Sequence, residues 1–365
     1  MAVEQNVNAT LTPPQSTTTT SSVKRTYHRR KSIKQKDIDT VLIVNPNSSS
    51  GVTGKGWDDL YSEIKNVLGR NLEVALTKKP GDGTTLARQF LKQGFKKVVA
   101  IGGDGTLNEV ANGFFEEPVG IHSDKIDGPV GSSSLKPINP DAIMGVVPAG
   151  TRNVLAKSLG LPEGIVACCK TFDVGNPKKM DAIYATVTSE GDPSSTTSRI
   201  CLNAAEMGVA GEIIERSKKV REVVNSRIVS TITSIAATLP TYQSNECEIS
   251  IDNGGRKFAI KMTMAVVANG QFLGGGFKVA PHASMSDGLL DLVILKDSDG
   301  LKMIDELINM KDGDYKEEDN IMYRQVKKVS LTSKERDVTV TVDGEPIGIL
   351  PATFEVIPQA LTLRM

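Results

Sequence analysis

Short apolar runs alternate with helix-like patterns between residues 40 and 148, and this alternation limits the fold more than any other feature of the 365-residue chain. The runs predict strands, and the segments between them have the spacing of amphipathic helices. The predicted strands are 40–45, 72–77, 97–103 and 143–148, and the predicted helices are 57–69, 84–94 and 106–115. Strands that alternate with helices form a parallel sheet covered by helices on both faces. We therefore predict an N-terminal parallel α/β domain over residues 39–170.

The pattern changes after about residue 171, where short β-prone segments are separated by turn residues, as in a β-sandwich. One helical stretch, 212–239, interrupts them and places Ile228, Ile232, Ile235 and Leu239 on one face. It is either a core-packing helix or a helix that covers an apolar substrate cleft. The predicted fold class is α/β plus all-β, with a C-terminal β-sandwich domain over residues 171–365.

Residues 1–38 differ from both parts. They are rich in Thr and Ser, contain a Pro-Pro pair and have too few large apolar side chains to form a core, so we predict a disordered tail. The later part of the tail, 24–36, concentrates Lys and Arg. This basic stretch is either a solvated linker or a contact with an anionic membrane surface.

Composition excludes several classes of function. Lys and Arg total 43, as do Asp and Glu, so no net field attracts nucleic acid. The 4 cysteines show no C-x-x-C spacing and the 3 histidines stand in unrelated contexts, which argues against a disulfide framework, a zinc site and a Ser-His-Asp triad. No apolar run reaches the roughly 18 residues of a membrane span, and the N-terminus lacks the apolar core of a signal peptide. We expect a cytoplasmic protein, soluble or peripherally membrane-associated.

Three polar or glycine-rich loops follow predicted strands, after Asn45, Ile101 and Pro148. Ligands of parallel α/β sheets bind at this edge, so one cleft can collect all of them. The first, 45–56, is predicted to be a polar loop and does not match a Walker A motif. In IGGDGTLNEVANG, the glycines let backbone N–H groups approach a phosphate at the start of a helix. Asp104 would repel a phosphate unless a cation intervened, which points to Mg²⁺; the alternative is an Asx-type turn that caps the helix.

The motifs NPNSSSG, GGDGTLNEVANG and PAGTRNVLA, in this order, resemble the diacylglycerol kinase catalytic-domain family, which includes soluble bacterial diacylglycerol kinases and sphingosine kinases. The segments NGQFLGGGFKVAPHASMSDGLLD and VDGEP are similar to later motifs of the family, so the resemblance runs from about residue 40 to the C-terminus. It implies a nucleotide-binding α/β domain followed by a β-sandwich, with ATP and lipid meeting in a catalytic cleft between them. The chain departs from the family in V-L-A where D-F-A is common, in Arg152 at a variable position, and in a longer insertion after Phe115.

The resemblance also implies roles for individual residues. Asp104 would hold metal–ATP and Glu345 would be the general base for the lipid hydroxyl, so these are the catalytic candidates. Asp82 would join the metal and water network, Asp287 would bind a separate structural Mg²⁺, and Glu212 would contact the lipid head group. The implied ATP-binding residues are Asn45, Ser49, Gly51, Thr77, Gly102, Gly103, Gly105, Thr106, Gly150, Thr151, Asn153 and Asp343.

These observations favour an ATP- and Mg²⁺-dependent lipid kinase that phosphorylates a membrane lipid such as diacylglycerol or a sphingoid-like lipid. The expected partners are ATP, a membrane lipid and a membrane surface, with no nucleic acid, and a homodimer is left open. A NAD kinase-like phosphotransferase is the nearest alternative enzyme, because it shares the GGDGT motif and the two-domain plan. A catalytically silent regulator that binds lipid or nucleotide is the alternative from another class.

Overall fold

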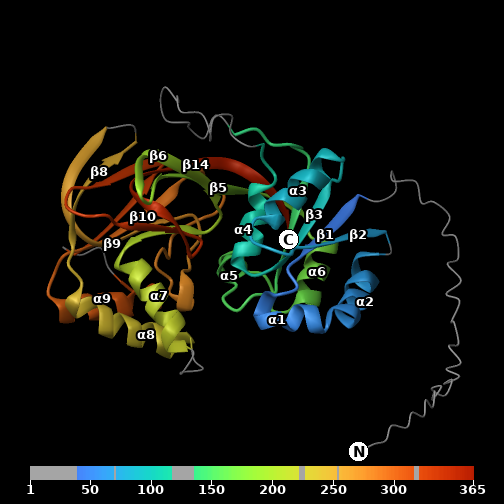
Figure 1. Ribbon diagram of the computed structural model, residues 1–365, viewed down its shortest axis with the longest axis horizontal. Helices are drawn as coiled ribbons and strands as arrows, with labels where there is room; N and C mark the ends of the chain where they lie inside the picture. The colour runs from blue at the N-terminus through green and yellow to red at the C-terminus, as the bar shows by residue number, and fades with distance from the viewer. Residues whose placement is uncertain (1–38, 70, 117–134, 222–226, 253–254, 316–319) are drawn as a thin grey trace, which may run out of the picture. The chain divides into compact units, whose positions relative to one another are not determined.

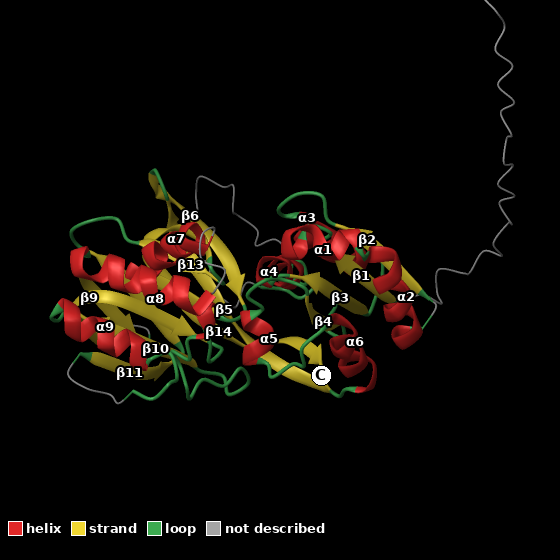
Figure 2. Ribbon diagram, turned by 90° about the horizontal axis from the view of Figure 1, so that it is seen from below, coloured by secondary structure: helices red, strands yellow, loops and turns green. Residues whose placement is uncertain are grey.

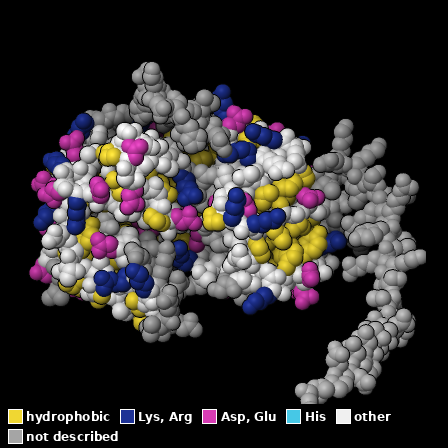
Figure 3. All heavy atoms as spheres, viewed as in Figure 1, with side chains coloured by type: hydrophobic (Ala, Val, Ile, Leu, Met, Phe, Trp, Pro, Cys, Tyr) yellow, Lys and Arg dark blue, Asp and Glu magenta, His cyan; other side chains and the backbone are white. Residues whose placement is uncertain are grey.

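The computed structural model describes residues 39–69, 71–116, 135–221, 227–252, 255–315 and 320–365 (Figure 1). Residues Ile38–Met365 form one compact unit. The tail predicted over 1–38 and residues 117–134 of the insertion after Phe115 lie outside the described residues. In the part that is described, no helix has both the length and the apolar character needed to cross a membrane. On the face shown in Figure 3, basic and acidic side chains are interspersed, in keeping with their equal totals of 43.

Parallel strands form the N-terminal sheet in the spatial order β2-β1-β3-β4. The inner strands β1 and β3 and the strand β4 are almost continuously buried, because helices cover both faces. The predicted parallel α/β layer is therefore confirmed. The strands are β1 (Thr40–Val44), β2 (Leu72–Leu76), β3 (Lys97–Gly102) and β4 (Ile143–Pro148).

Helices on each face of this sheet have their own apolar core. Ile64 of α2 and Phe172 of α6 pack with Leu42 on one face. Ala87 of α3 and Leu107 of α4 pack on the other face. A short helix, α5, follows β4. The bounds are α2 (Trp57–Leu68), α3 (Asp82–Lys92), α4 (Asp104–Asn112), α5 (Val154–Ser158) and α6 (Ile165–Val174).

A helix, α1 (Ser48–Lys55), stands where the sequence predicts a polar loop, so that prediction was wrong. The helix has no apolar stripe, and the side chains of Ser48 and Thr53 are buried instead. Gly54 packs against Pro46, where a Cβ would lie 2.8 Å from the carbonyl oxygen. Tertiary contacts of small polar residues therefore hold α1, and they leave no hydrophobic period in the sequence.

The C-terminal part is built mainly of antiparallel strands, with β11-β10-β9-β7-β13-β14 as its main spatial order and β5, β6, β8 and β12 joined to the side. Side chains such as Ile249, Leu292 and Phe354 form its central core. The strands are β5 (Pro177–Ser189), β6 (Asp192–Cys201), β7 (Ala204–Gly208), β8 (Asn245–Ile251), β9 (Arg256–Ala268), β10 (Leu290–Lys296), β11 (Ile321–Val326), β12 (Lys328–Ser333), β13 (Thr339–Val342) and β14 (Glu345–Arg364).

Helices α7 (Val209–Arg221), α8 (Arg227–Thr238) and α9 (Gly300–Asn309) lie along the sheet of the C-terminal part (Figure 2). The single helix predicted over 212–239 is therefore wrong, because α7 begins earlier and α8 is a separate helix. Ile235 and Leu239 do pack into the apolar core beneath these helices, as the core-packing interpretation expects.

The long strand β14 connects the two parts of the fold. It pairs antiparallel with β5 and β12 in the C-terminal part. Near its end it pairs parallel with β4, Thr362 opposite Ile143 and Leu363 opposite Met144. In Figure 1, β14 (red) runs from the C-terminal strands to the α/β layer. The last residues of the chain therefore complete the N-terminal sheet, which local patterning did not predict.

Candidate active site

The loops at the carboxyl ends of β1, β3 and β4 line one cleft of about 640 Å³, as predicted from the parallel sheet. Arg199 and Glu345 of the C-terminal part complete its wall. Gly51, Gly102 and Asn153 belong to the same loops without lining the cleft. The predicted site residues that do line it are Asn45, Ser49, Thr77, Gly103, Asp104, Gly105, Thr106, Gly150, Thr151 and Glu345.

Hydrogen bonds tie these loops to one another. Asn45 Nδ2 donates to Thr106 Oγ1 at 3.0 Å, and Ser49 Oγ donates to the carbonyl oxygen of Ala149 at 2.8 Å. Within the last loop, the N–H of Gly150 donates to Asn153 Oδ1 at 2.9 Å. The three loops therefore form one connected rim, whose hydroxyls and backbone amides suit phosphate oxygens.

Glycine is required where two of the loops touch. A Cβ on Gly150 would overlap the Cα of Gly103, so the GGDGT and PAGTRN loops pack backbone against backbone. A Cβ on Gly102 would lie 2.5 Å from the side chain of Thr106. Gly103 and Gly150 thus let two loops approach closely enough to share one ligand, which is a stronger reason for glycine than a turn alone.

Asp104 begins α4 and faces the cleft. Its Oδ1 accepts a 3.1 Å hydrogen bond from the N–H of Leu155 in α5, so it contacts the next helix as well as its own. Burial raises the pKa of Asp104, the charge of Asp343 raises it further, and the Leu155 hydrogen bond and Arg152 oppose the rise. A bound cation would stabilise the ionised form. No group of three or more metal-ligating side chains occurs among the described residues. One carboxylate completed by phosphate oxygens and water fits Mg²⁺.

Asp82 lies at the start of α3 and does not line the cleft. Its Oδ2 accepts hydrogen bonds from the N–H groups of Lys78 and Lys79, at 2.8 and 3.1 Å. The hydrogen bond from Lys78 is the main cause that lowers the pKa of this carboxyl. Asp82 therefore shapes the turn that carries Thr77, Lys78 and Lys79 along the cleft wall.

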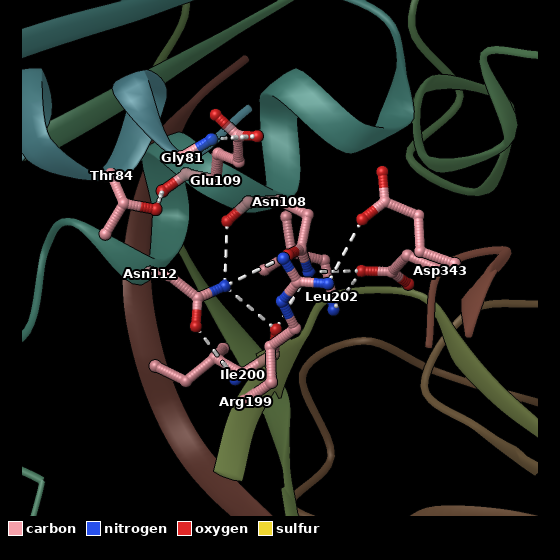
Figure 4. A network of polar contacts seen from close by, with 10 residues as sticks. Gly81, Thr84, Asn108, Glu109, Asn112, Arg199, Ile200, Leu202 and Asp343 are labelled. Atoms are coloured by element: carbon pink, nitrogen blue, oxygen red, sulfur yellow. Dashed lines mark hydrogen bonds and ion pairs between the residues drawn. The ribbon is translucent and has the colours of Figure 1, made fainter. Parts of the chain in front are cut away.

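Helix α4 links this turn to the C-terminal part (Figure 4). On one side, Glu109 accepts hydrogen bonds from the N–H groups of Gly81 and Gly83, at 2.8 and 2.9 Å. On the other side, Asn108 Nδ2 donates to the carbonyl oxygen of Ile200 and to Asp343 Oδ2, at 2.8 and 2.7 Å.

Asn112, one turn further along α4, exchanges hydrogen bonds with the backbone of Ile200. Sequence reasoning assigned no role to Asn108, Glu109 or Asn112. The polar spacing within LNEVANG was the available signal, because i and i+4 residues share a helix face.

Asp343 organises the turn between β13 and β14 and does not line the large cleft. Its backbone is left-handed, with φ of 49°. Its carboxylate accepts hydrogen bonds from the N–H groups of Leu202, Asn203 and Ala204, at 2.9, 2.8 and 3.2 Å, besides that of Asn108. Both oxygens are therefore engaged by protein donors, and Asp343 positions the turn that carries Glu345.

Glu345 faces the GGDGT loop from the opposite wall. Its Oε2 pairs with Arg199 Nη1 at 3.1 Å, and its side chain remains 47% exposed. A Cβ on Gly105 would lie only 2.5 Å from Glu345 Oε1, so the bare glycine makes room for this carboxylate. Asp104 of the α/β domain and Glu345 of the C-terminal part thus line the same cleft. Arg199 was missed, since a lone arginine in a polar strand carries no local signal.

Two further cavities adjoin the cleft and share lining residues with it or with each other. A chamber of about 20 Å³ is lined by Asp104, Arg152, Glu206 and Asp343, among others. An apolar cavity of about 80 Å³ lies beneath α7 and α8, and Arg152 lines all three spaces. Burial raises the pKa of Glu206 to about 7. The apolar walls of the last cavity include Ala210, Ile213, Ile235, Met264, Leu273 and Phe277.

Two predicted residues lie elsewhere. Glu212 is exposed on α7 and lines none of these cavities. Asp287 is exposed, and its Oδ1 accepts a hydrogen bond from the N–H of Leu289 at 3.0 Å. The nearby Asp291 is buried, which raises the pKa of its carboxyl, and Asp287 contributes to that rise.

Known proteins resemble this chain in both fold and sequence. Residues 39–185 match the family described as diacylglycerol kinase catalytic domain, and residues 204–365 match the YegS C-terminal NAD kinase beta sandwich-like domain. A diacylglycerol kinase of Bacillus subtilis (strain 168) is 25% identical over 313 residues, which cover 86% of this chain and 91% of that protein. A YegS-like lipid kinase of Chromohalobacter salexigens is 28% identical, over 85% of this chain and 88% of that protein.

A crystal structure of a diacylglycerol kinase from Bacillus anthracis str. Sterne has the same fold, with a TM-score of 0.62 and 20% identity over 89% of this chain and 96% of that one. Fold and sequence agree on the class of protein, a kinase with a catalytic α/β domain followed by a β-sandwich-like domain. The chain belongs to the diacylglycerol kinase catalytic-domain family, and it is an enzyme of the lipid kinase class.

Proposed function

We propose that this chain transfers the γ-phosphoryl group of ATP, with Mg²⁺, to the hydroxyl of a membrane lipid such as diacylglycerol or a sphingoid-like lipid. The observation that supports the proposal is one cleft lined by both Asp104 and Glu345, with a chamber and an apolar cavity beside it that share lining residues. Phosphoryl transfer needs little more from a protein than positioned phosphates, charge compensation and a base for the attacking hydroxyl.

Each part of the cleft takes one of these tasks. The connected loop rim holds the phosphates, using those of the implied ATP-binding residues that line the cleft. Asp104 holds Mg²⁺, which neutralises phosphate charge when bound, with Asp82 acting through the turn that it shapes. Arg199 adds a positive charge to the same wall. These residues fix the γ-phosphoryl group opposite the C-terminal wall.

Glu345 takes the proton of the lipid hydroxyl. The hydroxyl oxygen forms a bond to the γ-phosphorus while the bond from that phosphorus to the bridging oxygen of ADP breaks. Asp343 acts as a positioning residue, because its hydrogen bonds hold the turn that carries Glu345. The apolar cavity receives the lipid chain, so α8 both packs on the core and covers a substrate cavity.

The remaining assignments follow from this function. We propose the domain division 39–170 and 171–365, with β14 completing the first sheet. A role for Glu212 at the lipid head group and for Asp287 at a structural Mg²⁺ remain predictions, as does a homodimer. A lipid kinase must meet its substrate at a membrane, so we propose peripheral membrane association of a cytoplasmic enzyme of phospholipid metabolism, with the basic stretch 24–36 as the contact.

The decisive experiment supplies purified protein with radiolabelled ATP, with and without Mg²⁺, and with separate acceptors. Incorporation of label into diacylglycerol or a sphingoid lipid is expected, and only when Mg²⁺ is present. Label in NAD instead would support the alternative phosphotransferase. No label in any acceptor, despite ATP binding, would support a silent regulator.

A further inference from the structure

A small chamber with several polar side chains in its wall adjoins both the nucleotide cleft and the apolar cavity. It measures about 20 Å³ and is lined by polar side chains that include Asp104, Arg152, Asn203, Glu206 and Asp343. It shares Asp104 and Arg152 with the cleft, and it shares Arg152 and Glu206 with the apolar cavity. A lipid whose chain lies in the apolar cavity must therefore place its polar head in or beside this chamber to present a hydroxyl to the cleft.

Glu206 is a buried acid that the fold itself does not use. It lies on β7 with 6% of its surface exposed, between Ala205 and Met207, which both pack into the central core. Its backbone carbonyl accepts a hydrogen bond from Thr341 Oγ1, at 3.3 Å. Its carboxylate faces the cavities, and within the described part of the chain no side chain or backbone group bonds to it. A buried carboxylate without a partner destabilises a fold, so its presence points to a ligand.

Arg152 faces the same chamber from the loop between β4 and α5. Its guanidinium packs against Gly344, in the turn between β13 and β14, where a Cβ would be 2.9 Å from Nη1. Its charge opposes the rise in the pKa of both Glu206 and Asp104. Among the described residues it forms an ion pair with neither carboxylate. A positive and a negative group therefore face one chamber without contact, with room for a group about the size of one water molecule.

We propose that Glu206 and Arg152 bind a second polar group of the acceptor lipid, a hydroxyl or an amine on the carbon next to the reacting alcohol. Burial raises the pKa of Glu206 to about 7, so at a pH clearly above that value, such as the pH of about 9 chosen for the test, its carboxylate is ionised, only accepts hydrogen bonds and requires a donor. A hydroxyl can donate to Glu206 and accept from Arg152 at once, and an amine can donate to Glu206. An ester at that position offers acceptor oxygens only and leaves Glu206 unpaired. This inference rests on the proposed lipid kinase function and adds the acceptor class, because a free neighbouring donor is preferred over the ester of diacylglycerol.

The test uses the full chain and matched acceptors in one detergent, at a pH of about 9. 1-Oleoylglycerol and its 2-O-methyl ether share the acyl chain and the primary alcohol and differ in the neighbouring donor. We expect kcat/KM to be about 10–100-fold higher for the free hydroxyl. The 2-amino analogue shows which donor is preferred, and dioleoylglycerol supplies the ester.

Substitutions assign the preference to the residue. Glu206→Leu should bring the ratio of the two kcat/KM values close to one, because the required acceptor is removed. Glu206→Gln keeps an acceptor of the same size and should retain much of the ratio. Glu248→Gln is the matched control, since Glu248 is exposed on β8 and lines none of the three cavities.

The outcomes are as follows for a Glu206→Leu variant that circular dichroism shows to be folded. If its ratio of kcat/KM for 1-oleoylglycerol to kcat/KM for the ether equals that of the wild type, the inference is overturned. An unfolded Leu variant leaves the decision to Glu206→Gln and to the wild-type ratio, and a wild-type ratio near one overturns it. Should the wild type phosphorylate no acceptor, the proposed function fails separately. Equilibrium binding of 1-oleoylglycerol and its ether then decides, and equal affinities overturn the inference.

Discussion

The carboxylates of Asp104 and Glu345 both line the cleft, and their surroundings differ as their proposed roles do. Asp104 accepts a hydrogen bond from the start of α5, and burial raises the pKa of its carboxyl. A bound cation would offset that rise, because it stabilises the ionised carboxylate. Glu345 is half exposed, paired with Arg199 and placed over Gly105, where a lipid hydroxyl can reach it. These surroundings suit the proposed roles, in which Asp104 holds the cation and Glu345 takes the proton of the lipid hydroxyl.

Replacing Asp104 separates its function from its effect on stability. We expect Asp104→Asn to lose Mg²⁺-dependent turnover and yet to melt at a higher temperature than the nucleotide-free wild type at pH 7. The folded state raises the pKa of Asp104, so its stabilising contribution exists at low pH and is lost as the pH rises through that pKa. The difference in melting temperature should shrink at acid pH. Near-normal turnover in the variant would show that the loop is only a turn.

Replacing Glu345 tests the base directly. Glu345→Gln keeps the size of the side chain and removes its basicity, so turnover should fall by at least about a hundredfold. Affinities for ATP and lipid should change little, which single-turnover kinetics and equilibrium binding can measure. Glu248→Gln provides the surface control. Normal turnover would eliminate Glu345 as the base, and a loss of ATP binding would assign it a structural or metal-linked role.

Helix α4 is the central element of the site. Its first residue is Asp104, its Glu109 holds the turn before α3, and its Asn108 and Asn112 hold the C-terminal part. One helix therefore sets the positions of Asp104, the proposed metal ligand, of one cleft wall, and of the turn that carries Glu345, the proposed base. Displacement of α4 would affect all of them together.

Asn108 offers a test of this linkage. Asn108→Ala removes one of the two hydrogen bonds that the carbonyl of Ile200 accepts and one of the two that Asp343 Oδ2 accepts, at a site that is 2% exposed. The free energy of unfolding should fall by about 1–3 kcal/mol. The kcat should fall more than the affinity for ATP, because the turn of Glu345 loosens. Asn309→Ala, at an exposed position of α9, is the control; unchanged unfolding and kinetics in Asn108→Ala would contradict the linkage.

Helices and strands could be predicted from the sequence where their apolar residues recur at a regular spacing. The strands β1 and β3 are continuous apolar runs, and α2 and α3 have clear apolar stripes, so their types followed from sequence. Helix α1 was missed because it buries Ser and Thr, and α7 and α8 were merged because their apolar residues continue one pattern. Glu206 is the single charged residue in the mainly apolar segment NAAEMGVA. Its position marks it as an unusual residue for a buried strand, but the sequence does not indicate which cavity it faces.

The whole molecule brings together residues that are far apart in sequence. Gly105 and Glu345 approach closely because β14 begins in the C-terminal part, passes β5 and ends beside β4. No local period encodes such a pairing, so the opposition of Asp104 and Glu345 was implied by family resemblance alone. The same arrangement sets the apolar cavity beside the cleft, which suits the proposed acceptor, a molecule with a polar head and an apolar chain.

Such an acceptor stays in a bilayer, and the tail is the part of the chain whose composition suits docking there. The stretch 24–36 holds the densest cluster of Lys and Arg, and each is worth about 1 kcal/mol near an anionic surface. Deleting residues 1–38 should reduce co-sedimentation with phosphatidylserine vesicles, more at low salt than at high salt because salt screens the attraction. Activity on detergent-dispersed lipid should persist, because residues Ile38–Met365 form a compact unit that contains the whole cleft.

A second variant separates charge from length in this prediction. Replacing each Lys and Arg between 24 and 36 by Gln keeps the tail and removes its charge, so it should lose vesicle binding as the deletion does. Binding that survives the replacement but not the deletion would assign docking to other residues of the tail. Binding that survives both would transfer docking to residues 39–365, where the exposed Val229 of α8 and Ile308 of α9, beside the apolar cavity, would be the next surface to substitute.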